Sequence, residues 1–343
     1  MRTRSFLPLL GFIFAIVLLF LSAKLSGFGE FAWGLINPPT ALITFGTAYV
    51  LYFGSFFKSD KKQKNLMLFR FRWMREVLML TGLFGAVIGI TIMSTFAGSG
   101  EAIGVGLSAS LVAPLYGFFG AIGFYLLEKH LNESKNHEEM GTFTVKPGIN
   151  YRSITSIGII IIMLLMAIGV AVTAASPEPM NIVKLFFSLP IIYFIFAILL
   201  ASIFIFDGKT VIQAWVVPFI RAGTVLDNTL PTLRVIRGLK RIVSLMGLVA
   251  VSATPIVMIA TLGSIEEISE MFIPLGKSGA VLFWAMFCLL LLFLAEGQLV
   301  QQNYCKTGAI HSDDHFFIIK FVFPSFLIFF FSMWLAFLFQ LFA

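Results

Sequence analysis

Hydroxyl side chains inside two long apolar segments, Val77–Ala97 and Ala102–Leu127, are the groups of this chain best placed to do chemistry. A hydroxyl in such a segment donates back to a carbonyl of its own helix, bonds to a neighbouring helix, or offers its oxygen to an ion path. The sequence leaves these alternatives open. The candidates among them are Thr91, Ser94 and Thr95 in the first segment, and Ser108 and Ser110 in the second.

Pro114 is the other polar feature of the second segment. Proline removes one backbone donor from a helix and leaves a carbonyl oxygen without its partner. That carbonyl either accompanies a kink in the bundle or faces an ion.

Enzyme chemistry is not indicated. The sequence contains no phosphate-binding loop, nucleophile elbow or zinc-protease motif. His311, Asp313, Asp314 and His315 form a loop cluster without a defined ligand geometry, and the two cysteines do not form a metal-binding motif. We therefore predict no catalytic residue, no bound metal and no cofactor.

Small residues form a stripe on each of the two segments. They recur at helical spacing and so fall on one face of each predicted helix. In lipid, small residues matter because they allow helix backbones to approach closely. The pair is therefore predicted to pack against protein and not against lipid. The stripes are Gly82, Gly85 and Gly89, and Gly106, Ser110, Ala113, Gly117 and Gly120.

The composition indicates a membrane protein. Of the 343 residues, 59% are hydrophobic and 12% are charged, whereas about 25% are charged in ordinary soluble proteins. Roughly 20 apolar residues cross a bilayer core as a helix. The sequence thus predicts an all-α polytopic membrane bundle of about nine transmembrane helices: Ser5–Ala23, Pro38–Phe57, Val77–Ala97, Ala102–Leu127, Ile154–Ala174, Leu185–Phe206, Ile242–Leu262, Gly276–Ala295 and Phe316–Phe342.

Loop charges predict the orientation of these spans. The segments Lys58–Glu76 and Asp207–Arg241 hold seven and six Lys or Arg residues, while the alternate connections carry mostly acids. The positive-inside rule then places the N-terminus in the cytoplasm. Basic loops at the inner leaflet suit anionic lipid. The net charge of +7 does not indicate nucleic-acid binding, because the basic residues lie between spans.

No span carries a carboxylate near its middle. An acid within a membrane helix is the default mark of a proton relay. From the sequence we therefore expect that this chain alone holds no membrane-buried ionisable site, and that any such site belongs to a partner.

The chain repeats part of its pattern. Arg4-Ser5 at the start of the first span recurs as Arg152-Ser153 before the fifth, and Gly82-Leu83 in the third span recurs as Gly247-Leu248 in the seventh. An even number of spans in each copy makes this a tandem parallel repeat of a four-helix unit. The predicted organisation is a first unit over 1–130, a cytoplasmic linker over 131–152, a diverged second unit over 153–300, and a cytoplasmic loop with an extra span over 301–343.

Several motifs within residues 5–130 come in a familiar order. The stretch Asn37–Thr47 starts the second span, Gly82–Gly89 lies in the third, and Ser108–Gly117 lies in the fourth, after the turn at Glu101. This pattern resembles the MotA subunits of flagellar stators. In its last two helices it is similar to the wider MotA/TolQ/ExbB proton-channel group.

The resemblance implies a subunit of a proton- or sodium-driven complex in the bacterial inner membrane. In such complexes several copies form a ring around a single-span partner similar to MotB, ExbD or TolR, and the partner carries the ion-binding aspartate. The third and fourth spans are then expected to line the central path. The expected path or partner-facing residues are Gly85, Gly89, Thr91, Ser94, Thr95, Ser108, Ser110, Pro114 and Gly117.

The sequence departs from the family in three respects, one of which is the duplication with its ninth span, which would alter any ring. Pro114 lies where the family often has a threonine, and the cytoplasmic domain of stator subunits is reduced to Lys58–Glu76, so contact with a flagellar rotor is not implied. Two alternatives stay open: a non-conducting membrane scaffold derived from the family, and a solute transporter built from parallel repeats.

Overall fold

The computed structural model describes most of the chain as a bundle of helices. The first predicted span, Ser5–Ala23, lies outside the described residues. Every structural statement below concerns residues 38–56, 64–95, 100–133, 148–149, 154–162, 189–221, 229–261, 272–307 and 316–342.

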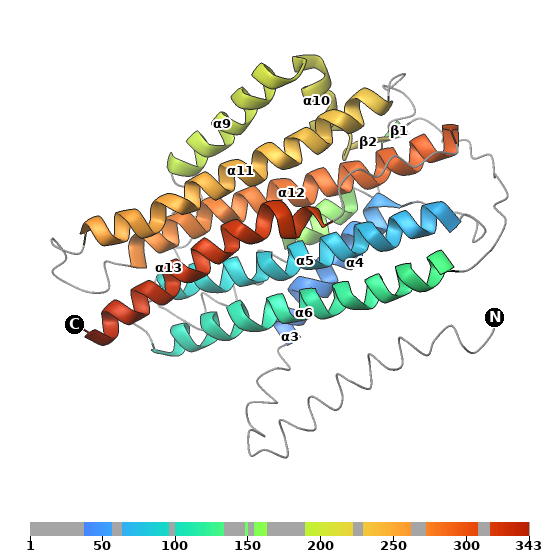
Figure 1. Cartoon of the computed structure of the whole chain (residues 1–343). Helices are drawn as coiled ribbons and strands as arrows, with labels where there is room; N and C mark the ends of the chain where they lie inside the picture. The colour runs from blue at the N-terminus through green and yellow to red at the C-terminus, as the bar shows by residue number, and fades with distance from the viewer. Residues whose placement is uncertain are drawn as a thin grey trace, which may run out of the picture.

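Five helices in the described part are long and apolar enough to cross a membrane. They match the third, fourth, seventh, eighth and ninth predicted spans, and Figure 1 shows them lying alongside one another. Helices suit this environment because they satisfy their backbone hydrogen bonds within one segment. The five are α5 (Lys64–Thr95), α6 (Gly100–Glu133), α11 (Thr229–Thr261), α12 (Phe272–Thr307) and α13 (Phe323–Phe342).

The remaining described elements are short. Two apolar stretches, Leu42–Ser55 and Ile191–Ile205, are helical but shorter than a full span, so the expected count of nine transmembrane helices is not confirmed. Residues 154–162 are also helical. The short elements are α3 (Pro38–Ala41), η2 (Leu42–Gly46), α4 (Thr47–Ser55), α9 (Leu189–Ile205), α10 (Gly208–Val216), η5 (Ile318–Val322), and the antiparallel strands β1 (Gly148–Ile149) and β2 (Ile220–Arg221).

Three long helices extend well beyond the spans that hydropathy predicts. Helix α5 begins at Lys64 instead of Val77, and α11 begins at Thr229 instead of Ile242. Helix α12 continues past Ala295 to Thr307. Hydropathy detects only the apolar part of a helix, whereas these charged ends stay helical because their side chains form ion pairs inside the bundle.

Helix α5 lies at the centre of the bundle. Every residue from Trp73 to Ser94 is buried, with α6 packed on one side and α12 on another. The Phe84 ring stacks on Phe283 of α12 with 4.9 Å between ring centroids, and Trp73 Nε1 donates to the carbonyl oxygen of Phe293 at 3.0 Å. Helix α12 in turn packs between α5 and α11. The chain therefore encloses α5 with its own helices.

Candidate functional site

The two stripes of small residues meet each other between α5 and α6. A Cβ atom on Gly89 would lie 2.6 Å from the carbonyl oxygen of Gly106, and one on Gly117 would lie 2.6 Å from that of Leu78. Such distances show that the two backbones are in direct contact, which only glycine permits. The prediction that these stripes are buried against protein is confirmed. Within this chain, each stripe packs against the other.

Three of the predicted hydroxyl residues bond within their own helix. The hydroxyl of Thr91 donates to the carbonyl oxygen of Val87 at 2.7 Å, and that of Ser94 donates to Thr91 at 2.8 Å. The hydroxyl of Ser110 donates to Leu107 at 2.8 Å. All three are buried. Of the alternatives that the sequence left open, bonding within the helix is the one seen for these three side chains.

The nine predicted site residues fall into separate groups. Gly85, Gly89, Ser110 and Gly117 come together at the α5–α6 interface. Thr91 lies against Gly279 of α12, on a different side of α5. The remaining positions are Ser108 and Pro114, which are half-buried on α6, and Ser94 and Thr95, which lie at the end of α5. Helix α6 continues through Pro114 without interruption.

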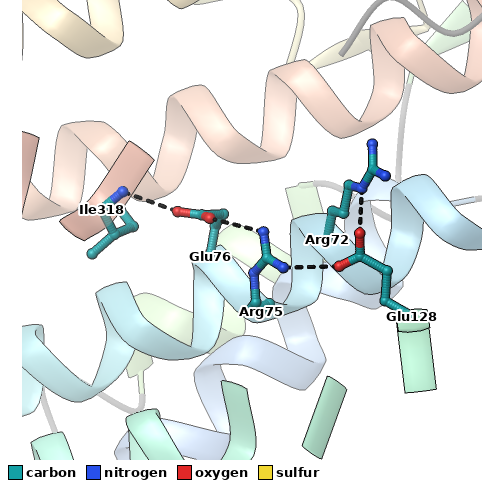
Figure 2. Close-up of polar contacts among 5 residues, drawn as sticks. All are labelled: Arg72, Arg75, Glu76, Glu128 and Ile318. Atoms are coloured by element: carbon teal, nitrogen blue, oxygen red, sulfur yellow. Dashed lines mark hydrogen bonds and ion pairs between the residues drawn. The ribbon is translucent and has the colours of Figure 1, made fainter. Parts of the chain in front are cut away.

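A cluster of charges joins the first part of α5 to the last part of α6. The first charge cluster consists of Arg72, Arg75 and Glu128, and Figure 2 shows its ion pairs. Arg72 Nε donates to one carboxylate oxygen of Glu128, and Arg75 Nη1 donates to the other at 2.8 Å. Arg75 is 5% and Glu128 12% exposed at the side chain, so this pairing is made away from solvent. Two guanidinium groups thus hold one carboxylate.

Glu76 extends the first charge cluster toward the last helix. Its carboxylate accepts the backbone N–H of Ile318 at 2.9 Å and lies 3.5 Å from Arg75 Nη2 (Figure 2). Lys240 of α11 is close enough to interact with it electrostatically. The backbone donors that open a helix have no acceptor within that helix. Glu76 satisfies one of them and thereby connects α5 to η5.

A second charge cluster joins α11 to α12 in the same way. It consists of Arg237, Lys240 and Glu296. Arg237 Nε donates to one carboxylate oxygen of Glu296 at 3.1 Å, and Lys240 Nζ donates to the other at 2.6 Å. The Lys240 ammonium also lies 3.9 Å from the centroid of the Phe293 ring and 4.6 Å from that of Phe317. Again two cations hold one buried carboxylate.

The expectation that this chain holds no membrane-buried ionisable site stays a prediction, but two acids are buried within the described helices. Glu76 and Glu296 each lie immediately outside a predicted span, Val77–Ala97 and Gly276–Ala295 respectively, yet both are buried inside long apolar helices. Buried ionisable groups in such helices are candidates for function. Sequence reasoning missed one signal. Two cations three residues apart on one long helix are followed by a glutamate on the next long helix, as Arg72 and Arg75 are by Glu128, and Arg237 and Lys240 by Glu296.

Comparison with known proteins identifies one family. Residues 59–142 match the model of the MotA/TolQ/ExbB proton channel family, which confirms the resemblance over about a quarter of the chain. The matched segment contains α5, α6, the first charge cluster and all nine predicted site residues. No curated protein and no solved structure gives a significant match. Together with the five long apolar helices, the match indicates a membrane subunit of the proton-channel type.

Proposed function

We propose that this chain is an integral subunit of a proton- or sodium-driven complex in the bacterial inner membrane. The observation that carries the proposal is the family match over α5 and α6, the two helices whose glycine stripes pack in direct contact. In this proposal several copies form a ring around the helix of a single-span partner similar to MotB, ExbD or TolR. The partner supplies the ion-binding aspartate, and the chain has no enzymatic role.

We also propose that the chain is a tandem repeat whose second unit has diverged. Arg237 and Lys240 follow Arg72 and Arg75 by 165 residues, the same offset that separates Gly82-Leu83 from Gly247-Leu248. In each pair of long helices the second one carries the shared glutamate. A short apolar helix also precedes each long pair. These matches support two parallel four-helix units and, with the extra last helix, nine spans.

Both charge clusters lie on the cytoplasmic side of the membrane in the proposed orientation. The N-terminus is then cytoplasmic, so α5 and α11 begin at that side and α6 and α12 end there. The basic loops next to them lie against anionic lipid of the inner leaflet.

The nine predicted site residues take different parts in this proposal. Ser108 and Pro114 contact the partner helix, because they lie half-buried on α6. The interface residues Gly85, Gly89, Ser110 and Gly117 hold α6 against α5. Thr91, Ser94 and Thr95 lie near the outer end of α5, where the hydroxyls of Thr91 and Ser94 bond within the helix.

Purification of the intact complex tests this proposal. The full chain is isolated from native membranes in mild detergent, and its mass and co-purifying proteins are measured. We expect several copies of the chain together with a single-span protein that has an aspartate in its membrane helix. A photoreactive label on a Ser108→Cys variant should cross-link to that protein.

Ile192→Cys on α9 provides the matched control, because Ile192 is 58% exposed on a helix distant from α6. A photoreactive label at this position should not cross-link to the partner. Isolation of the chain without any single-span protein would contradict the proposal, as would equal cross-linking from both positions.

A further inference from the structure

Three buried hydroxyl groups lie along η2 and α4 without a hydrogen bond from the bundle. Thr44, Thr47 and Ser55 are 0%, 1% and 0% exposed, and none of their hydroxyl oxygens has a hydrogen-bond partner among the described residues. Helices α5 and α6 pack against η2, and helices α5 and α12 pack against α4. These three residues, here named the hydroxyl face, are therefore covered by protein.

Buried hydroxyls on other helices of the bundle are bonded. A serine or threonine in a helix can donate its hydroxyl to a carbonyl oxygen three or four residues earlier, and this satisfies the group without any other partner. A hydroxyl that is buried without a partner destabilises the fold, so three of them on one short helical stretch need an explanation. The buried hydroxyls that do bond within their own helix belong to Thr81, Thr91, Ser94, Ser110, Ser202, Ser244 and Ser332.

Helix α12 adds another polar group where α4 ends. A Cβ atom on Gly297 would lie 3.2 Å from the hydroxyl oxygen of Ser55, and the adjacent Gln298 donates its Nε2 to the carbonyl oxygen of Gly54 at 3.2 Å. Gln302 lies one turn further along the same side of α12. It is 4% exposed, and its Nε2 has no hydrogen-bond partner in the part of the chain that the structure describes. A buried amide donor thus accompanies the hydroxyl of Ser55.

The backbone at the other end of the hydroxyl face is also unusual. Thr44 belongs to η2, a π-helical turn over Leu42–Gly46, and π-helical turns are rare and occur frequently at functional sites. A Cβ atom on Gly85 of α5 would lie 3.9 Å from the hydroxyl oxygen of Thr44. This observation is independent of the hydroxyl bonding and concerns the same stretch of chain.

We propose that the hydroxyl face binds ordered water molecules, which bridge η2 and α4 to the neighbouring helices inside one chain. A hydroxyl both donates and accepts hydrogen bonds, whereas the amide nitrogen of Gln302 only donates. Water complements both kinds of group, and a protein interior holds it through about two to four polar partners. A bare cation fits this set less well, because it needs oxygen acceptors. The inference goes beyond the proposed function and depends neither on a partner protein nor on ion flux.

Isosteric substitution tests whether these hydroxyls bind water. Thr47→Val keeps the shape of the side chain and removes only the hydroxyl. If water is bound there, the variant loses hydrogen bonds, and we expect the midpoint of unfolding in detergent to fall. Removal of a hydroxyl that has no partner should instead raise the midpoint, because the cost of burying that group disappears. Ser55→Ala is expected to lower the midpoint for the same reason.

Thr81→Val is the matched control. Thr81 is 0% exposed on α5, and its hydroxyl donates to the carbonyl oxygen of Leu78 within the same helix. Its removal leaves no group without a partner, because that carbonyl also belongs to the backbone ladder of α5. The midpoint should therefore change less than in Thr47→Val.

Radiolytic labelling of the unmodified full chain detects the water itself. An X-ray pulse converts water to hydroxyl radicals, which oxidise the side chains next to it, and mass spectrometry locates the products. Leu51 is 0% exposed and lies one turn from both Thr47 and Ser55 on the same side of α4, so we expect it to be labelled. Phe84, which is also 0% exposed and stacks on Phe283, should not be labelled.

The proposal is overturned if Thr47→Val is at least as stable as the unmodified chain, or if Leu51 is labelled no more than Phe84. It is also overturned if the unfolding midpoint is higher in sodium or potassium chloride than in choline chloride and Thr47→Val abolishes that difference, because a cation then occupies the hydroxyl face. If Thr47→Val does not fold, the labelling of Leu51 in the unmodified chain decides alone. None of these outcomes bears on the proposed function.

Discussion

Replacing Glu296 by glutamine is expected to destabilise the folded chain by about 3–5 kcal/mol. The carboxylate is the counter-charge of Arg237 and Lys240, whose side chains are 12% and 6% exposed. Without it both buried cations lose this counter-charge, while the ammonium of Lys240 stays between the rings of Phe293 and Phe317. Unfolding of the purified chain in detergent, followed by tryptophan fluorescence, measures the loss.

The first charge cluster provides an internal comparison for this prediction. Glu128→Gln removes the carboxylate that Arg72 and Arg75 share, so a loss of similar size is expected. Lys129→Gln, at an exposed neighbouring position, should change stability by less than about 0.5 kcal/mol. The triple variant Arg237→Met/Lys240→Met/Glu296→Leu should recover much of the loss, because apolar replacement of a whole buried charge cluster is tolerated better than its partial removal. Equal stability of Glu296→Gln and the unmodified chain would show that the second cluster is not a structural contact.

Replacing Gly89 by valine is expected to force α5 and α6 apart. A Cβ on Gly89 would lie 2.6 Å from the Gly106 carbonyl oxygen and 2.8 Å from the Ser110 nitrogen. Both atoms belong to the backbone, so neither can rotate away. Overpacking of this kind costs about 1–3 kcal/mol, and more where the backbone must shift. The yield of folded chain and its unfolding in detergent should both fall.

Gly158→Val serves as the control for this substitution. A Cβ at Gly158 meets nothing within 4 Å, so valine should be accommodated there without movement of the helix. If Gly89→Val and Gly158→Val left the chain equally stable, the close approach of α5 and α6 would not contribute to the fold.

Local periodicity correctly predicted that the two stripes of small residues are buried against protein, although it did not predict that they pack against each other. The glycines of Val77–Ala97 and the small residues of Ala102–Leu127 recur at helical spacing, and a stripe of small residues needs a partner backbone to be useful. The two segments adjoin in sequence, so each stripe has the other within reach. The structure places them together.

The charge clusters could not be predicted by the same reasoning. Arg75 and Glu128 are separated by 53 residues, and Glu76 and Ile318 by 242 residues. Hydropathy ends a span where charges begin, so it assigned Glu76 to a loop. The helix continues there because its charged side chains find partners on other helices, and sequence periodicity alone does not identify those partners.

The nine predicted site residues lie in separate groups, and this too could not be predicted because it depends on contacts between distant parts of the sequence. Periodicity places Thr91 and Gly89 on one helix but does not say which helix covers each side of α5. Helix α12 covers the Thr91 side through residues from the far half of the sequence, such as Gly279. The enclosure of α5 therefore depends on the second half of the chain, for which the sequence provided only a weak internal match.

Ion flux into sealed vesicles tests the proposed function most directly. The chain is reconstituted alone and together with its co-purified single-span partner, and proton or sodium entry is followed with a fluorescent indicator under an imposed gradient. We predict flux only with the partner present, and loss of flux when the partner's membrane aspartate is replaced by asparagine. Vesicles that hold the complete complex and remain as tight as empty vesicles would contradict an ion-driven role and favour a scaffold.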